Sequence, residues 1–180
     1  MAFGSRLPAL GGMDLGGMDR IRLRHLLVVL SLASGCRPAE RQATDSSFAD
    51  VQRRGETVMG VDQYTSKHVF EDLPDGGRIV LDRDDASDTA GVRTIRAHMR
   101  TIESAFQRGD FTLPGVVHAS EVPGTRVMAE KRSTIAYRAA DRARGAEVRI
   151  TTRDPAAVAA VHAFLKFQRS DHRAAGHESH

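Results

Sequence analysis

The chain has 180 residues, enough for one compact domain, and an apolar content of 41% that can supply a hydrophobic core. Four of the 26 basic residues and two of the 23 acidic residues precede Cys36, so the rest of the chain is nearly neutral. Nucleic-acid binding is therefore not expected, since it needs a concentrated basic surface. The single cysteine excludes an intramolecular disulfide.

Residues 18–36, MDRIRLRHLLVVLSLASGC, have the pattern of a secretory signal. Three arginines precede the mostly apolar run LLVVLSLA, and small residues follow it. The run is too short to span a membrane, which takes about 20 apolar residues. We therefore predict that residues 1–35 are an N-terminal extension plus signal peptide, and that the protein is exported. Either Met1 or Met18 is compatible with this pattern as the start.

Cys36 follows LASG and resembles the cysteine of a bacterial lipobox, which carries a diacylglycerol. The resemblance predicts a lipoprotein anchored to a membrane of the bacterial envelope, and simple cleavage into the periplasm is the alternative. Residues 36–50 are polar and lack periodicity, so we expect a flexible tether. A single domain is predicted over 51–172 and a disordered tail over 173–180. No protein partner follows from the sequence.

The segment 67–85 predicts a β-hairpin, with LPDGG as its turn. A helix is predicted next, with Ser87 or Asp88 as its N-cap and Gly109 as its stop. Its apolar stripe has spacings of three and four residues and consists of Val92, Ile95, Met99, Ile102 and Phe106.

The plan then repeats after an expected loop over 110–124. The segment 133–152 predicts a second hairpin, and Asp154 with Pro155 predicts the start of a second helix. Neither ββα unit can bury its apolar surface alone. The predicted fold is therefore α+β, a ββα-ββα pseudo-repeat with two helices on one face of a four-stranded antiparallel sheet.

Histidines are frequent after Cys36 and belong to different predicted elements. Imidazole is a ligand for copper, zinc and nickel, and the thioether of methionine favours Cu(I). We predict a metal site, with copper or zinc as the cofactor, formed by His68, His98, His118 and His162. Secondary candidates are Met59, Asp62, Asp110 and His172.

The two predicted helices place His98 and His162 at similar positions, so both are expected to point into one seam. His162 and His172 lie ten residues apart, about 80° around a helix axis, and do not share a face. His172 is expected in the last turn, where a cation suits the helix dipole.

Two other functions remain open at this stage. His98, His118 or His162 with Asp110 would form an acid–base pair of an enzyme of unknown substrate. Alternatively, the histidines only cap and pack in a structural envelope component, because no His-x-His or His-Glu-x-x-His spacing occurs. We favour a non-catalytic binding protein.

Four segments resemble a family of small exported bacterial proteins of uncharacterised function: RRGETVMGVDQYTSKHVF, IRAHM, RGDFTLPGVVHASEVPG and VHAFLKFQRSDHR. The resemblance covers about residues 51–175. The matching positions are Met59, Gly60, Asp62, His68, His98, Gly109, Asp110, Phe111, His118, His162, Asp171 and His172. The departures are Val61 for phenylalanine and Ser66-Lys67 before the histidine. The resemblance implies export and a recurring histidine set, without implying an activity.

Some proteins of this kind are described as aspartate carbamoyltransferases. Such an enzyme binds carbamoyl phosphate with a Ser-Thr-Arg-Thr loop, which this sequence lacks. The chain is also about half the length of its two-domain subunit. We do not expect this activity.

Overall fold

The computed structural model describes residues 38–60 and 62–174, which belong to one compact unit. The predicted signal segment, Cys36 and most of the predicted tail lie outside the described residues. Within the described residues, no helix has the length and apolar content needed to cross a membrane.

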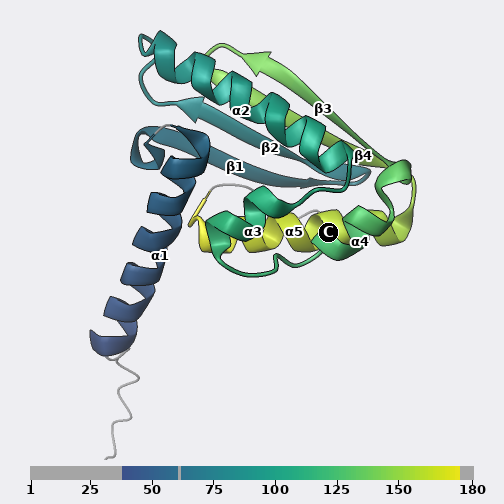
Figure 1. Cartoon of the computed structure of the whole chain (residues 1–180), viewed down its shortest axis with the longest axis horizontal. Helices are drawn as coiled ribbons and strands as arrows, with labels where there is room; N and C mark the ends of the chain where they lie inside the picture. The colour runs from purple at the N-terminus through teal and green to yellow at the C-terminus, as the bar shows by residue number, and fades with distance from the viewer. Residues whose placement is uncertain (1–37, 61, 175–180) are drawn as a thin grey trace, which may run out of the picture. The chain divides into compact units, whose positions relative to one another are not determined.

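The predicted α+β fold is confirmed (Figure 1). A four-stranded antiparallel sheet has the order β1-β2-β4-β3, and α2 and α5 pack on one face of it. The strands are β1 (Ser66–Leu73), β2 (Gly76–Arg83), β3 (Ile135–Arg142) and β4 (Gly145–Thr152). The helices on the sheet are α2 (Thr89–Gln107) and α5 (Pro155–Asp171).

The predicted starts of both sheet-covering helices are confirmed. Asp88 accepts a hydrogen bond from the Gly91 N–H at the start of α2, and Asp154 accepts from two N–H groups at the start of α5. Gly109 follows the C-cap of α2 with φ +79°, a conformation that glycine adopts without strain. These local signals mark where the two helices begin and where α2 ends.

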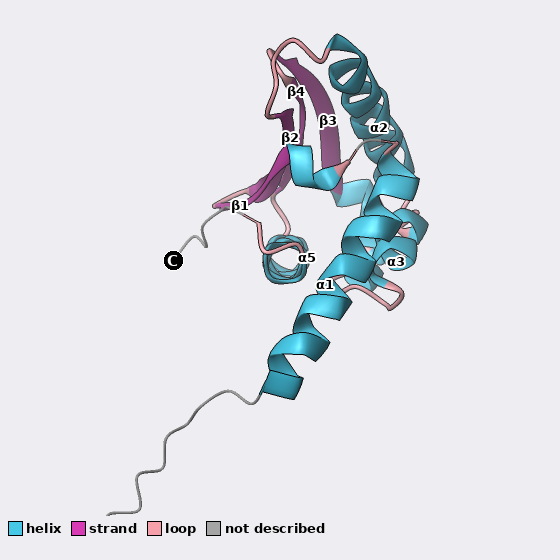
Figure 2. Ribbon diagram, turned by 90° about the vertical axis from the view of Figure 1, so that its left-hand side faces the viewer, coloured by secondary structure: helices cyan, strands magenta, loops and turns pink. Residues whose placement is uncertain are grey.

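Three further helices were not predicted: α1 (Pro38–Met59), α3 (Thr112–His118) and α4 (Thr125–Glu130). The prediction of a flexible tether over 36–50 is wrong from Pro38 onward, and the expected loop over 110–124 contains α3. Figure 2 shows α1 beside α3, and the two are in contact. The mutual packing supplies the burial that each segment lacks in its own sequence pattern. The described residues also contain two 3₁₀ turns: η1 (Gln63–Thr65) and η2 (Arg132–Thr134).

The two halves exchange their helices. The helix α2 follows the β1–β2 hairpin but packs mainly on β3 and β4, while α5 follows the β3–β4 hairpin and packs mainly on β1 and β2. The fully buried side chains come from both halves: Phe106, Phe164, Ile95, Met99, Met128, Ile150, Leu165, Val148 and Val161. Neither half therefore has a complete core of its own.

The halves join where β2 pairs with β4, and a glycine in each hairpin permits the close approach. A Cβ on Gly76 would lie 2.4 Å from the carbonyl oxygen of Ile150, and one on Gly145 would lie 1.9 Å from that of Leu81. The two glycines hold equivalent places, since each begins the second strand of its hairpin. Only glycine fits either place without displacing the neighbouring strand.

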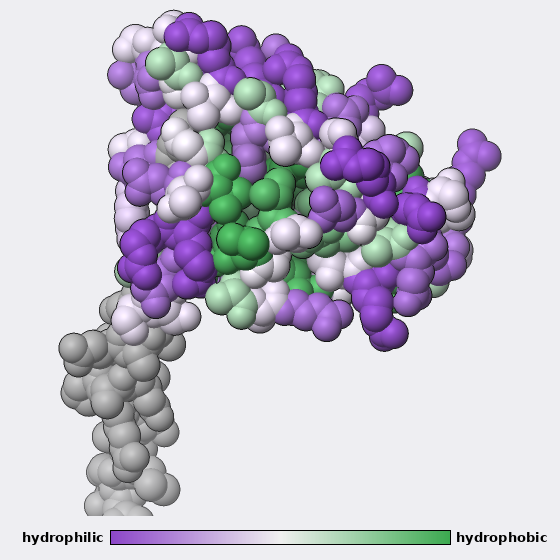
Figure 3. All heavy atoms as spheres, viewed as in Figure 1, coloured by the Kyte–Doolittle hydropathy of each residue, from purple (hydrophilic) through white to green (hydrophobic). Residues whose placement is uncertain are grey.

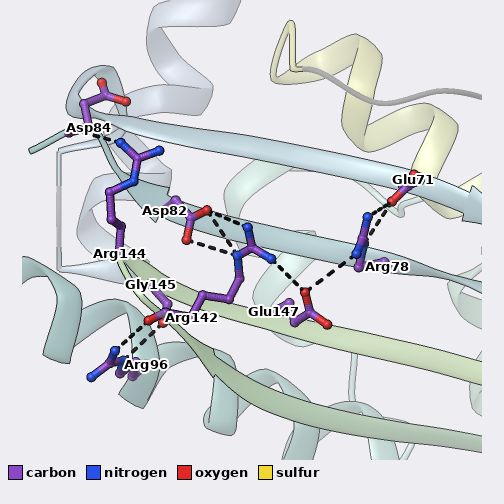
Figure 4. A network of polar contacts seen from close by, with 9 residues as sticks. All are labelled: Glu71, Arg78, Asp82, Asp84, Arg96, Arg142, Arg144, Gly145 and Glu147. Carbon is purple, nitrogen blue, oxygen red and sulfur yellow. Dashed lines mark hydrogen bonds and ion pairs between the residues drawn. The ribbon is translucent and has the colours of Figure 1, made fainter. Parts of the chain in front are cut away.

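The sheet face opposite the helices carries a chain of ion pairs (Figure 4). Arg142 lies between Asp82, at 3.1 Å, and Glu147, also at 3.1 Å. Arg78 lies between Glu147, at 3.9 Å, and the carboxylate of Glu71. This chain of two arginines and three carboxylates links all four strands across the sheet.

We predict that Gly145→Ala destabilises the protein by about 2 kcal/mol or more, because the added methyl group meets a backbone oxygen of the central strand pair. Urea unfolding followed by circular dichroism measures the change. Gly115→Ala is the matched control. It lies in α3, where a Cβ would be 3.8 Å from its nearest neighbour, and is expected to gain about 0.5–1 kcal/mol. Equal effects of the two substitutions would contradict this account of the β2–β4 junction.

Candidate functional site

A pocket of about 80 Å³ lies between the sheet and the helices. Its walls are apolar side chains of α1, β1, β2, α2, α3 and α5. Figure 3 shows hydrophobic residues gathered in a hollow near the middle of the face seen in Figure 1, between β1 and α3. The polar residues that line the pocket are Gln63, His68, His98, Gln168 and His172. An apolar pocket with a few convergent polar groups is the usual form of a small-ligand site.

Three of these polar residues are histidines from three different elements. His68 lies on β1, His98 on α2, and His172 is the C-cap residue of α5. The ring centroids of His68 and His172 are 5.5 Å apart. The His172 ring also stacks on Phe70, with centroids 5.7 Å apart. Sheet and helix packing thus brings together residues that are about a hundred positions apart in the sequence.

Burial keeps all three imidazoles uncharged near neutral pH. It lowers the pKa of His68 to about 4, with a smaller effect from nearby His98, whose own pKa burial lowers to about 4. Burial, with His68 and His118 nearby, lowers the pKa of His172 to about 3. The expectation that His172 is a cation at the helix end is therefore wrong, because desolvation outweighs the helix dipole.

Two imidazole nitrogens of the pocket are buried without a hydrogen-bond partner. They are Nε2 of His68 and Nδ1 of His172. Gln63 donates from Nε2 to the Gln52 carbonyl at 3.1 Å, which leaves its own Oε1 buried and unpartnered. An unpartnered buried polar atom costs about 1–3 kcal/mol, and such atoms are rare in folded proteins. Their gathering in one pocket points to a ligand that supplies the missing contacts.

His118, from the end of α3, lies behind His172 with ring centroids 5.0 Å apart. Its side chain is 1% exposed, its Nδ1 is hydrogen-bonded to the Asp171 carboxylate, and its Nε2 lies 3.0 Å from Oε1 of Gln168. Each ring nitrogen therefore faces an acceptor already. This arrangement fixes the position of the His118 ring against His172 and leaves neither nitrogen free to bind a ligand.

His162 lies elsewhere, and the expected seam with His98 is wrong. Its Nε2 donates a hydrogen bond to the Leu73 carbonyl at 3.0 Å, at the β1–β2 turn. Arg96 holds the equivalent place on α2, eight residues after the helix N-cap, and donates to the Arg142 carbonyl at 2.6 Å (Figure 4). His162 thus corresponds to Arg96 rather than to His98, and its role is to hold a hairpin turn.

Of the secondary candidates Met59, Asp62 and Asp110, only Met59 lines the pocket with the three histidines. Asp62 accepts from the Tyr64 N–H at 2.8 Å, and Asp110 accepts from the Thr112 N–H at 2.9 Å. Both aspartates therefore make local hydrogen bonds. Hydrogen bonds from the side chain and the backbone N–H of Thr112 hold the pKa of Asp110 below its usual value.

The predicted set His68, His98, His118 and His162 does not form one cluster. Across residues 38–60 and 62–174, no group of three or more His, Cys, Asp or Glu side chains is arranged to hold a metal ion. The structure instead joins His68 and His98 with His172, and places His118 behind them. The predicted lipidation site, Cys36, lies outside the described residues.

The other half of the fold provides an internal comparison for the His68–His172 pair. Tyr137 holds the place of His68, five residues before its strand ends, and Phe106 holds the place of His172, eighteen residues after its helix N-cap. The rings of Tyr137 and Phe106 are 5.6 Å apart at 74°, against 5.5 Å at 65° for the histidines. The fold thus fills this place once with Tyr and Phe and once with two histidines. Counting residues from caps and strand ends would have shown from the sequence that His68 and His172 hold places equivalent to those of Tyr137 and Phe106.

Comparison with known proteins gives no further guide to this site. A scan against family models, a search of curated proteins and a search of solved structures find no match for the chain. The resemblance to the exported bacterial family stays a prediction, and the function is argued from the pocket alone.

We predict that stability falls on acidification, starting near pH 6.5. In the unfolded chain these histidines bind protons at about pH 6.5. In the folded chain they bind protons only at about pH 4 or below, so the unfolded state is protonated first as the pH falls. Each histidine contributes a slope of up to about 1.4 kcal/mol per pH unit within this window. Urea unfolding at a series of pH values measures the slope.

His172→Phe is the informative variant, because Phe106 shows that phenylalanine fits the equivalent place. The slope of this variant is expected to be smaller than that of the wild type. An unchanged slope would show that His172 is not held neutral by the folded structure.

Proposed function

We propose that this is an exported, non-catalytic binding protein of the bacterial envelope, whose pocket holds a transition-metal ion on His68 and His172. The observation that carries the proposal is the pair of buried, unpartnered imidazole nitrogens in an otherwise apolar pocket. Metal binding requires neutral imidazole, and burial supplies that form at physiological pH.

A purely packing role accounts less well for these residues. The equivalent place in the other half holds Tyr137 and Phe106, whose pair has one polar atom, a buried hydroxyl without a partner. The histidine pair leaves two ring nitrogens unpartnered in the same kind of place, each with a desolvation penalty. A bound ion removes that penalty by taking the two lone pairs.

An acid–base enzyme is the second candidate, favoured by the contact between His118 and Asp171. A carboxylate often orients a catalytic imidazole in this way. However, Gln168 occupies the other nitrogen of His118, and the ring is shielded from solvent. A general base needs that nitrogen for its substrate, so the arrangement supports positioning of His172 better than proton transfer.

Export is proposed from the signal-like segment before Cys36. The helix α1 begins two residues after Cys36. A lipid on this cysteine would therefore hold the domain at the membrane through a helix rather than through a flexible linker. The proposal includes the envelope location and this anchor, with the metal site as its functional part.

We predict that the purified, untagged chain retains one equivalent of metal after titration with Cu(I), Cu(II), Zn(II) or Ni(II) and passage over a chelating column. His172→Phe and His68→Phe are expected to abolish retention. His162→Gln is the matched control, because this histidine lies outside the pocket, and it is expected to retain the metal. Metal at 100 times its Kd should also stabilise the wild type by about 2.7 kcal/mol.

A second control addresses His177 and His180, which lie outside the described residues. The double substitution His177→Ala/His180→Ala is expected to leave retention unchanged. Retention that survives both pocket variants but is lost with the tail substitutions would overturn the proposal, as would no retained metal at all. In the latter case, the histidines have a packing role, and a structural component of the envelope becomes the better description.

A further inference from the structure

We propose that the ion is Cu(I), held between Nε2 of His68 and Nδ1 of His172, with Met59 as a neighbouring soft donor. This inference rests on the proposed function, and it names the oxidation state and the coordination of the site. Four observations on the pocket carry it: the number of free donors, their charge, their softness and the shielding from water.

The number of fully buried, unpartnered nitrogens matches a two-coordinate ion; His98 also lines the pocket, but its nitrogens are not among these buried atoms. Two imidazole nitrogens in the pocket are both buried and unpartnered. With metal–nitrogen bonds of about 2 Å, two opposite imidazoles have ring centroids about 6 Å apart. The centroids of His68 and His172 are 5.5 Å apart at 65°, so the rings must separate by about half an ångström and turn both nitrogens toward the ion.

The charge of the lining favours a monovalent ion. All polar residues that line the pocket are histidine or glutamine, and no carboxylate or thiolate is among the described lining residues. The solvation cost of a buried ion rises with the square of its charge, so a divalent ion gains more than a monovalent one from anionic ligands that offset this cost. Neutral donors in an apolar pocket are thus better matched to Cu(I) than to Zn(II) or Ni(II).

The donor types agree with this choice. Soft thioether sulfur favours Cu(I), and imidazole accepts copper in either oxidation state. Met59 is buried at the end of α1 and lines the same pocket as both histidines. Met59 is therefore the candidate for a weak third donor.

The surroundings fix one ligand and shield the ion. His118, itself held by Asp171, packs edge-on against the His172 ring and restricts the positions open to that ring. Residues of α1 and α3 line the pocket on the side away from the sheet. Both donor nitrogens are themselves buried, so an ion held between them has little contact with water, which limits the oxidation that Cu(I) risks in an exported protein.

The test is an anaerobic competition titration of the untagged chain against a chromogenic Cu(I) chelator, with X-ray absorption of the loaded chain. We expect one equivalent of Cu(I) and an absorption edge typical of two nitrogen ligands, with or without a weak sulfur. His68→Phe and His172→Phe should each weaken binding more than about 100-fold, since loss of an outer-shell partner alone costs roughly 10–100-fold. Circular dichroism confirms that each variant is folded, and His162→Gln is expected to bind as the wild type does.

The outcomes separate this inference from the proposed function. Retention of Zn(II) or Ni(II), but not Cu(I), through the same two histidines would overturn the inference and leave the proposed function intact. Cu(I) bound with four ligands, or bound equally by the two pocket variants, would also overturn the inference. Absence of any metal binding would overturn both.

Discussion

The whole structure depends on the antiparallel contact between β2 and β4. The two ββα halves meet along this line, and each helix covers the strands of the other half. Gly76 and Gly145 make the contact possible, because any larger residue would meet a carbonyl oxygen of the opposite strand. If the two strands separated, both α2 and α5 would lose the surface on which they pack. Folding of either half alone is therefore not expected to be stable.

This symmetric construction creates the same local arrangement twice, with different residues in the two copies. Each copy places a ring from the end of a helix against a ring from an edge strand. In one copy Phe106 and Tyr137 complete the core. In the other, His172 and His68 lie where α1 and α3 form additional walls, and a pocket remains. One structural principle thus yields a packing contact in one half and a candidate binding site in the other.

Local sequence signals predicted much of this fold, but only part of the site. The hairpins, the caps Asp88 and Asp154, and the apolar stripe of α2 follow from propensity and periodicity, and they are confirmed. The helices α1 and α3 did not follow, because their stability comes from packing on each other. His68 and His98 of the predicted set line the pocket, whereas His162 lies outside it, because positions on the two helices were compared without counting from the helix N-caps. The pairing of His172 with His68 depends on tertiary packing that periodicity does not contain.

The most direct test of the account is a long-range ¹H–¹⁵N NMR titration of the histidine rings with Cu(I) under anaerobic conditions. Cu(I) is diamagnetic, so each ring nitrogen stays observable as the ion binds. The account predicts that Nε2 of His68 and Nδ1 of His172 shift together and saturate at one equivalent, while the His162 resonances stay in place. Shifts confined to His177 and His180, with the pocket histidines unchanged, would contradict it.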